Sequence, residues 1–148
     1  MTRLINLIAT FLLMLVTGIF WGPWFALTRS LSMFEPAEFI KITKILSKNL
    51  GPTMQFLLPG AILTMITATC FYQQTSSLYL SLPAIALIVI ALIITVAVEV
   101  PIVKNVEQWT DAILPANWQV KRDRWLKFHV FRVLSAILSF ALWIAIFI

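Results

Sequence analysis

The sequence has few of the side chains from which soluble enzymes build their surfaces and sites. Of its 148 residues only 11% are charged, and it holds one cysteine, Cys70, and one histidine, His129. A lone cysteine forms no internal disulfide, and a lone histidine supplies too few ligands for a tetrahedral zinc site or a di-iron bundle. Phosphate-binding loops and dinucleotide fingerprints are absent too. We therefore expect no bound metal and no cofactor.

Hydrophobic residues make up 61% of the chain, against about 45–50% in ordinary soluble domains. A bilayer is crossed by about 20 apolar helical residues, and four stretches are long enough: residues 4–27, 53–72, 82–103 and 126–148. A signal peptide is the other reading of the first stretch, but its length and its tryptophans, Trp21 and Trp24, favour a retained helix. We predict a single all-α domain over residues 1–148, an antiparallel four-helix bundle whose partner is the lipid bilayer.

Residues 36–50, between the first two stretches, have the pattern of an amphipathic helix. Glu35 can cap it, Pro36 suits its first position and Gly51 can end it. One face carries apolar side chains and another carries lysines: Phe39, Ile42, Leu46 and Leu50 against Lys41, Lys44 and Lys48. We predict that this helix lies on the membrane surface.

The basic residues are distributed unevenly between the two ends of the predicted bundle. Loops 28–52 and 104–125 and the positions just beyond them hold nine: Arg29, Lys41, Lys44, Lys48, Lys104, Lys121, Arg122, Arg124 and Lys127. The opposite end holds Arg3 alone. The positive-inside rule predicts that both loops are cytoplasmic and both termini outside, in an inner or plasma membrane. The net charge of +5 then indicates attraction to anionic lipid rather than to nucleic acid.

Small residues in the first two spans indicate where helices approach one another. Gly18 and Gly22 form one such pair, and Gly60, Thr64 and Ala68 form a second series. We expect these residues to pack helices within the bundle. A homodimer through Gly18 and Gly22 is the alternative.

Two charged residues, Glu99 and Arg132, lie inside apolar spans, where a charge is costly and is usually paired. At about 1.5 Å of rise per residue, Glu99, Arg132 and Trp21 all fall near the inner edge of the hydrocarbon, and Gln55 belongs close by. Side chains at steps of four and three form a stripe on one face of the last helix: Trp118, Arg122, Trp125, His129 and Arg132. We predict a Glu99–Arg132 ion pair with His129 beside it, and such pairs more often serve structure than catalysis.

Two segments of the last third, VEVPIVKNVEQW and RDRWLKFHVFR, resemble the anthrone oxygenase-like family of small four-helix membrane proteins. The residues that carry the resemblance are Glu99, Pro101, Asn105, Trp109, Trp125, His129 and Arg132. The resemblance implies oxidation of anthrones to anthraquinones by dioxygen. A base removes a proton from the acidic methylene, and the carbanion reacts with dioxygen without a cofactor.

Within that resemblance we expect His129 to act as the base, Arg132 to stabilise the enolate and Glu99 to hold either of them in place. A flat aromatic substrate would be bound by Trp21, Trp24, Gln55, Asn105, Trp109 and Trp125. A protein that binds a small apolar aromatic ligand with the same polar residues is a second reading. The alternative from another class is a non-enzymatic membrane scaffold or accessory subunit with a structural Glu99–Arg132 pair. An enclosed cavity beside His129 that admits a flat molecule favours the enzyme, whereas side chains filling that space favour the scaffold.

Overall fold

A computed structural model describes residues 2–110 and 113–148, so Met1 and part of the predicted loop 104–125 lie outside the described residues. The helical elements, in chain order, are α1 (Thr2–Ala26), η1 (Thr28–Met33), α2 (Pro36–Thr69), α3 (Thr75–Ile94), η2 (Thr95–Glu99), α4 (Val100–Glu107) and α5 (Trp118–Ala145). Within the described ranges the only extended pairing is an isolated bridge between Thr110 and Ile113. The predicted all-α class is confirmed.

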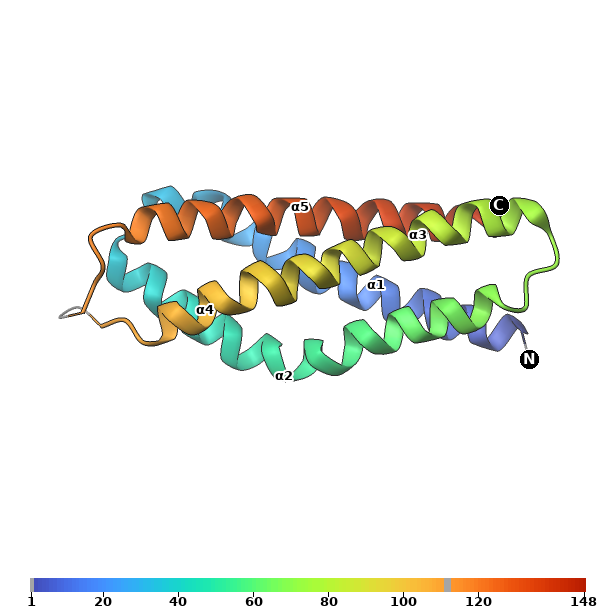
Figure 1. The fold of residues 1–148 in the computed structure, drawn as a ribbon, viewed down its shortest axis with the longest axis horizontal. Helices are drawn as coiled ribbons and strands as arrows, with labels where there is room; N and C mark the ends of the chain where they lie inside the picture. The colour runs from blue at the N-terminus through green and yellow to red at the C-terminus, as the bar shows by residue number, and fades with distance from the viewer. Residues whose placement is uncertain (1, 111–112) are drawn as a thin grey trace.

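The described residues form four long rods, because α3, η2 and α4 follow one another as a single continuous helix (Figure 1). Both termini and the α2–α3 turn lie at one end, and η1 and the end of α4 lie at the other (Figure 1). The rods are long and apolar enough to cross a membrane over Thr2–Met33, Pro36–Thr69, Thr75–Glu107 and Trp118–Ala145. The predicted antiparallel four-helix bundle is therefore present.

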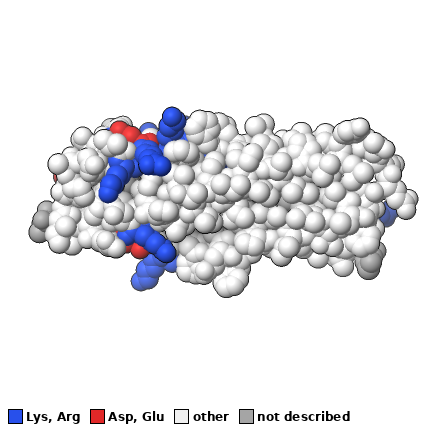
Figure 2. Space-filling view, in the orientation of Figure 1, with Lys and Arg blue, Asp and Glu red and all other residues white. Residues whose placement is uncertain are grey.

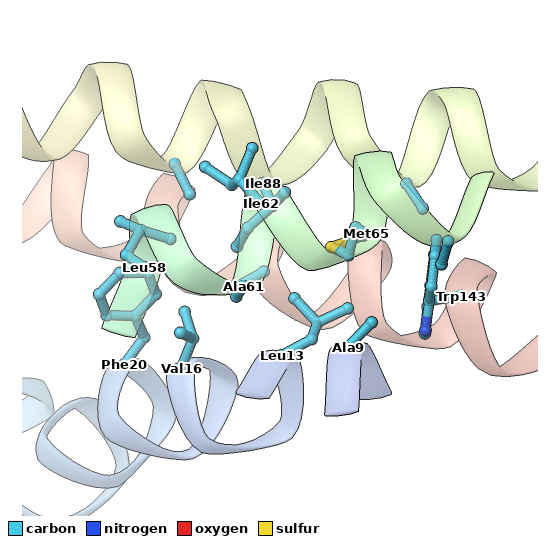
Figure 3. Packing of buried hydrophobic residues seen from close by; sticks show 14 of the residues in the cluster. Ala9, Leu13, Val16, Phe20, Leu58, Ala61, Ile62, Met65, Ile88 and Trp143 are labelled. Atoms are coloured by element: carbon cyan, nitrogen blue, oxygen red, sulfur yellow. The ribbon is translucent and has the colours of Figure 1, made fainter. Parts of the chain in front are cut away.

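The core is built from one face of each rod. On α1 the buried residues follow helical steps of four, three and four, namely Ala9, Leu13, Val16 and Phe20, and they meet Leu58, Ala61, Ile62 and Met65 of α2 (Figure 3). Toward the end with the termini, fully buried Trp143 donates its indole N–H to Thr10 Oγ1 at 3.0 Å. Because lipid provides no hydrophobic force between helices, such close packing and polar contacts hold the rods together.

The second helix differs from the prediction of a separate surface helix over residues 36–50. Glu35 and Glu38 form the capping box at its start, but α2 then continues through Gly51 and Pro52 to Thr69 as one helix. The apolar face of the first half of α2 is covered by other parts of the protein. Phe39 is fully buried, in a second cluster with Leu31, Ile40, Val106, Trp109 and Trp125. Contacts with α4 and α5 therefore keep this segment aligned with the bundle.

The expectation that small residues pack helices within the bundle is confirmed for Ala68, which is fully buried in the core, but is wrong for the glycines. Among residues 2–110 and 113–148, no neighbouring helix or side chain lies within 4 Å of where a Cβ would stand on Gly18, Gly22 or Gly60. The inward face of α1 is set by Val16 and Phe20, so Gly18, midway between them, faces outward. The homodimer through Gly18 and Gly22 stays a prediction.

Charged side chains gather at the end of the molecule that holds η1 and α4, and a broad uncharged surface follows (Figure 2). A small basic spot is also visible near the opposite end of the molecule (Figure 2). This is the arrangement of an integral membrane protein with one strongly basic end, which we call the charged end. The side of the membrane on which it lies stays a prediction.

Candidate functional site

Glu99 is turned into the bundle by a local irregularity in the third rod. At η2 the N–H of Val100 donates to the carbonyl of Thr95, five residues back, so one turn is π-helical rather than α-helical. Pro101 follows at once and has no N–H to donate. The side chain of Glu99 is only 4% exposed. The wide turn therefore places a carboxylate in the interior of an otherwise apolar rod.

Arg132 on α5 contacts Glu99, His129 and Thr95, and we call these four residues the polar cluster. Its Nη2 lies 3.1 Å from Glu99 Oε2 and donates to His129 Nδ1 at 2.6 Å. Its Nη1 donates to Thr95 Oγ1 at 3.3 Å, and its guanidinium lies 4.4 Å from the ring centroid of Phe20. The predicted ion pair between Glu99 and Arg132 is thus present, with His129 beside it.

The contact with Arg132 decides which nitrogen of His129 carries the proton. A guanidinium only donates hydrogen bonds, so Nδ1 must accept, and a neutral imidazole then holds its hydrogen on Nε2. That Nε2 is buried without a partner among the described residues. Trp125 stacks on the imidazole with ring centroids 5.1 Å apart and planes 8° from parallel, which fixes the ring orientation.

Glu99 likewise has one oxygen without a partner. Its Oε2 is paired with Arg132, whereas the buried Oε1 accepts no hydrogen bond from any described residue and lies 3.9 Å from His129 Nδ1. Buried polar atoms are nearly always hydrogen-bonded in native proteins. Glu99 therefore has an acceptor, and His129 a donor, that no described residue satisfies.

A cleft of about 450 Å³ lies beside this cluster, within the range of small-molecule sites. Its lining comes from α1 (Ile19, Phe20, Pro23), α2 (Thr43, Leu46, Ser47, Leu50, Gly51, Met54, Gln55), η2 and α4 (Thr95, Glu99, Val100, Val103, Lys104, Glu107) and α5 (Trp125, His129, Arg132). The walls of the cleft are largely apolar. The buried side chains of Glu99 and His129 form its polar end.

Five of the nine predicted site residues line this cleft: Gln55, Glu99, Trp125, His129 and Arg132. Trp21 and Trp24 do not. Trp21 is exposed and stacks on Phe25, and Trp24 packs at the edge of the core near Arg29.

Asn105 and Trp109 also lie away from the cleft lining. Asn105 Oδ1 accepts a hydrogen bond from Lys121. Trp109 is buried against Phe39, and its carbonyl accepts a hydrogen bond from Lys44 at 3.0 Å. These two residues fasten α4 to its neighbours at the charged end.

Two residues of the site were missed by the sequence analysis. Thr95 lies four residues before Glu99, a helical spacing that could have indicated a shared face. Phe20 continues the inward series of α1 from Ala9, Leu13 and Val16. Counting depth alone selected Trp21, the outward neighbour, because depth does not distinguish the faces of a helix.

Residues 2–110 and 113–148 contain no group of three or more His, Cys, Asp or Glu side chains that could hold a metal ion. The cluster therefore offers a carboxylate, an imidazole and a guanidinium as its chemical groups.

Fold and site together define a four-helix membrane protein with a polar-ended cleft between its helices. The family model for anthrone oxygenase matches residues 47–142, more than half of the chain. The chain therefore belongs to the anthrone oxygenase family, as the two motifs indicated. No curated protein and no solved structure matches it.

Proposed function

We propose that the protein is a membrane oxygenase that converts the central methylene of a flat, anthrone-like compound into a carbonyl with dioxygen. The observation that carries the proposal is the cleft of about 450 Å³ lined by Glu99, Trp125, His129 and Arg132. Four buried atoms of these side chains have no partner among the described residues: Glu99 Oε1, Trp125 Nε1, His129 Nε2 and Arg132 Nε. The family match supports the class of reaction.

The cleft suits a flat apolar molecule that bears a carbonyl. Phe20, Met54 and Trp125 are among its apolar and aromatic walls. Such a compound partitions into the bilayer, and the cleft opens between helices of membrane-spanning length. The ketone oxygen would accept the N–H of His129 Nε2, and the methylene would face Glu99.

The reaction balances with dioxygen as its only co-reactant. Glu99 Oε1 takes one proton from the methylene, and the electron pair left on carbon delocalises onto the ketone oxygen. Dioxygen accepts this pair in forming a carbon–oxygen bond, and the resulting peroxide takes up a proton. Loss of the second methylene proton and cleavage of the oxygen–oxygen bond give the new carbonyl and water. The methylene is oxidised, dioxygen is reduced, and no other reductant is required.

This proposal changes the roles that the sequence analysis expected for His129 and Glu99. His129 was expected to be the base, but its accepting nitrogen is already occupied by Arg132. The proposal therefore makes Glu99 the base. His129 and Arg132 stabilise the developing enolate, as preorganised donors do in many enzymes.

A scaffold or accessory subunit was the alternative from the sequence. A scaffold was expected to fill the space beside His129 with side chains, and a cleft of about 450 Å³ occurs there instead. This observation favours the oxygenase.

The test is dioxygen uptake by the purified protein in detergent with anthrone as substrate, together with product analysis under ¹⁸O₂. Spontaneous oxidation is subtracted using protein-free samples. We expect one dioxygen consumed for each quinone formed and ¹⁸O in the new carbonyl. Uptake no faster than in protein-free buffer would overturn the proposal.

A further inference from the structure

A second groove, of about 280 Å³, lies on the surface between the third and fourth rods. It is lined by Ala97 and Val98 of η2, Pro101, Ile102 and Asn105 of α4, and Lys121 and Arg124 of α5. It shares no residue with the cleft. The groove is therefore a separate site with its own chemistry.

The groove changes polarity along its length. Its apolar part is formed by Ala97, Val98, Pro101 and Ile102, and its polar part by Asn105, Lys121 and Arg124. Ala97 and Asn105 are separated by about 12 Å along the helix at 1.5 Å per residue. The polar part lies toward the charged end and the apolar part toward the membrane interior. This is the polarity of a phospholipid headgroup followed by its acyl chain.

Two cations, Lys121 and Arg124, line the polar part of the groove. Lys121 and Arg124 are three residues apart, so they lie on one face of α5. Lys121 donates to Asn105 Oδ1 and lies 5.4 Å from the ring centroid of Trp109. Arg124 lies 5.9 Å from that of Phe128. Neither forms an ion pair with a carboxylate among residues 2–110 and 113–148. Two neighbouring like charges of this kind favour an anion between them.

We propose that this groove binds an anionic phospholipid. The phosphate lies against Lys121 and Arg124, Asn105 holds Lys121 in place, and an acyl chain follows Ala97 and Ile102. Basic pockets between transmembrane helices bind anionic headgroups in this manner. The site does not depend on the proposed oxygenase activity.

Binding is measured by native mass spectrometry of the detergent-solubilised protein titrated with phosphatidylglycerol, with phosphatidylcholine or with inorganic phosphate. We expect binding of phosphatidylglycerol in preference to both others. In Lys121→Gln/Arg124→Gln we expect about 25-fold weaker binding, because each basic side chain contributes about five-fold. The matched control, Lys41→Gln/Lys48→Gln, removes two exposed lysines elsewhere and should bind as the wild type does.

A second variant separates the groove from general electrostatic attraction. Ala97→Phe keeps every charge but fills the apolar part of the groove, and we expect it to lose phosphatidylglycerol binding. Ala86→Phe, at an exposed position of α3 outside both sites, is its control. Unchanged binding in Ala97→Phe or in the double glutamine variant, or equal binding of phosphatidylcholine or of inorganic phosphate, would overturn the proposal. Thermal unfolding without lipid verifies that each variant is folded.

Discussion

Arg132 on α5 and Glu99 on η2 form an ion pair inside the bundle, with Nη2 and Oε2 3.1 Å apart. The glutamate side chain is 4% exposed and that of the arginine 12%. Each charge alone would be costly at this depth, so the pair fixes the third and fourth rods relative to one another. The same guanidinium orients His129. One contact thus contributes to both the fold and the site.

Removal of one partner of the pair should destabilise the protein strongly. Arg132→Gln leaves the Glu99 carboxylate buried without its counter-charge, which typically costs about 3–5 kcal/mol. In Glu99→Gln/Arg132→Gln the two amides can bond to each other, so we expect part of the loss to be recovered. Denaturant unfolding in detergent micelles measures both effects. Losses that simply add in the double variant would contradict direct coupling.

Phe20 and Trp21 should differ in their contributions to stability. Phe20 is buried and lies beneath the guanidinium of Arg132, so Phe20→Leu should cost about 1–3 kcal/mol. Trp21 is exposed on the outer surface, so Trp21→Leu should cost clearly less. Thermal unfolding of the two variants under identical conditions makes the comparison. The reverse order would mean that α1 turns its other face inward.

Filling the cleft should impair oxidation while leaving the fold intact. Gly51 lines the cleft, and a Cβ placed there would meet no described atom within 4 Å apart from its chain neighbours and the backbone of its own helix. We expect Gly51→Phe to occupy substrate space and to raise KM for anthrone at least about ten-fold, a loss of about 1.4 kcal/mol of binding.

The matched control for that variant is Gly60→Phe, on the same helix but outside the cleft and with equally open surroundings. It should retain the wild-type KM. Equal KM values for Gly51→Phe and Gly60→Phe would place substrate binding elsewhere.

Chemical labelling of the single cysteine, Cys70, determines the orientation of the bundle in the membrane. Cys70 is exposed and follows α2 at the end that also holds both termini (Figure 1). If the charged end is cytoplasmic, as the positive-inside rule predicts, a membrane-impermeant maleimide should label Cys70 from outside intact cells. The cysteine of Cys70→Ser/Lys48→Cys should be labelled only after lysis. Labelling in the opposite order would reverse the topology.

The sequence was sufficient for the fold class and for the central pair. Apolar runs of bilayer length predict helices reliably, because few other structures satisfy the hydrogen bonds of the backbone within lipid. Glu99 and Arg132 were found because charges within such runs need partners. His129 and Trp125 followed from helical spacing on the face of Arg132.

Other features depend on contacts between segments that are distant in the sequence. The amphipathic pattern of residues 36–50 fits a membrane surface and a helix-covered face equally well. Burial of Phe39 against Trp109 decides between them. The proton position on His129 follows from one hydrogen bond from Arg132, which residue spacing does not specify. Trp21 was selected by its depth, and only the packing of α1 shows that Phe20 faces the site.

The most direct test of the account is the kcat of Glu99→Gln for anthrone oxidation, compared with that of Asp123→Asn. Asp123 is an exposed carboxylate on α5 that pairs with Arg122 and does not line the cleft, so its replacement removes one negative charge without removing a cleft residue. General-base catalysis contributes about 10²–10⁴-fold. We therefore predict that kcat falls at least about 100-fold in Glu99→Gln, partly recovers in Glu99→Asp, and is unchanged in Asp123→Asn. A folded Glu99→Gln protein with the kcat of Asp123→Asn would contradict the account.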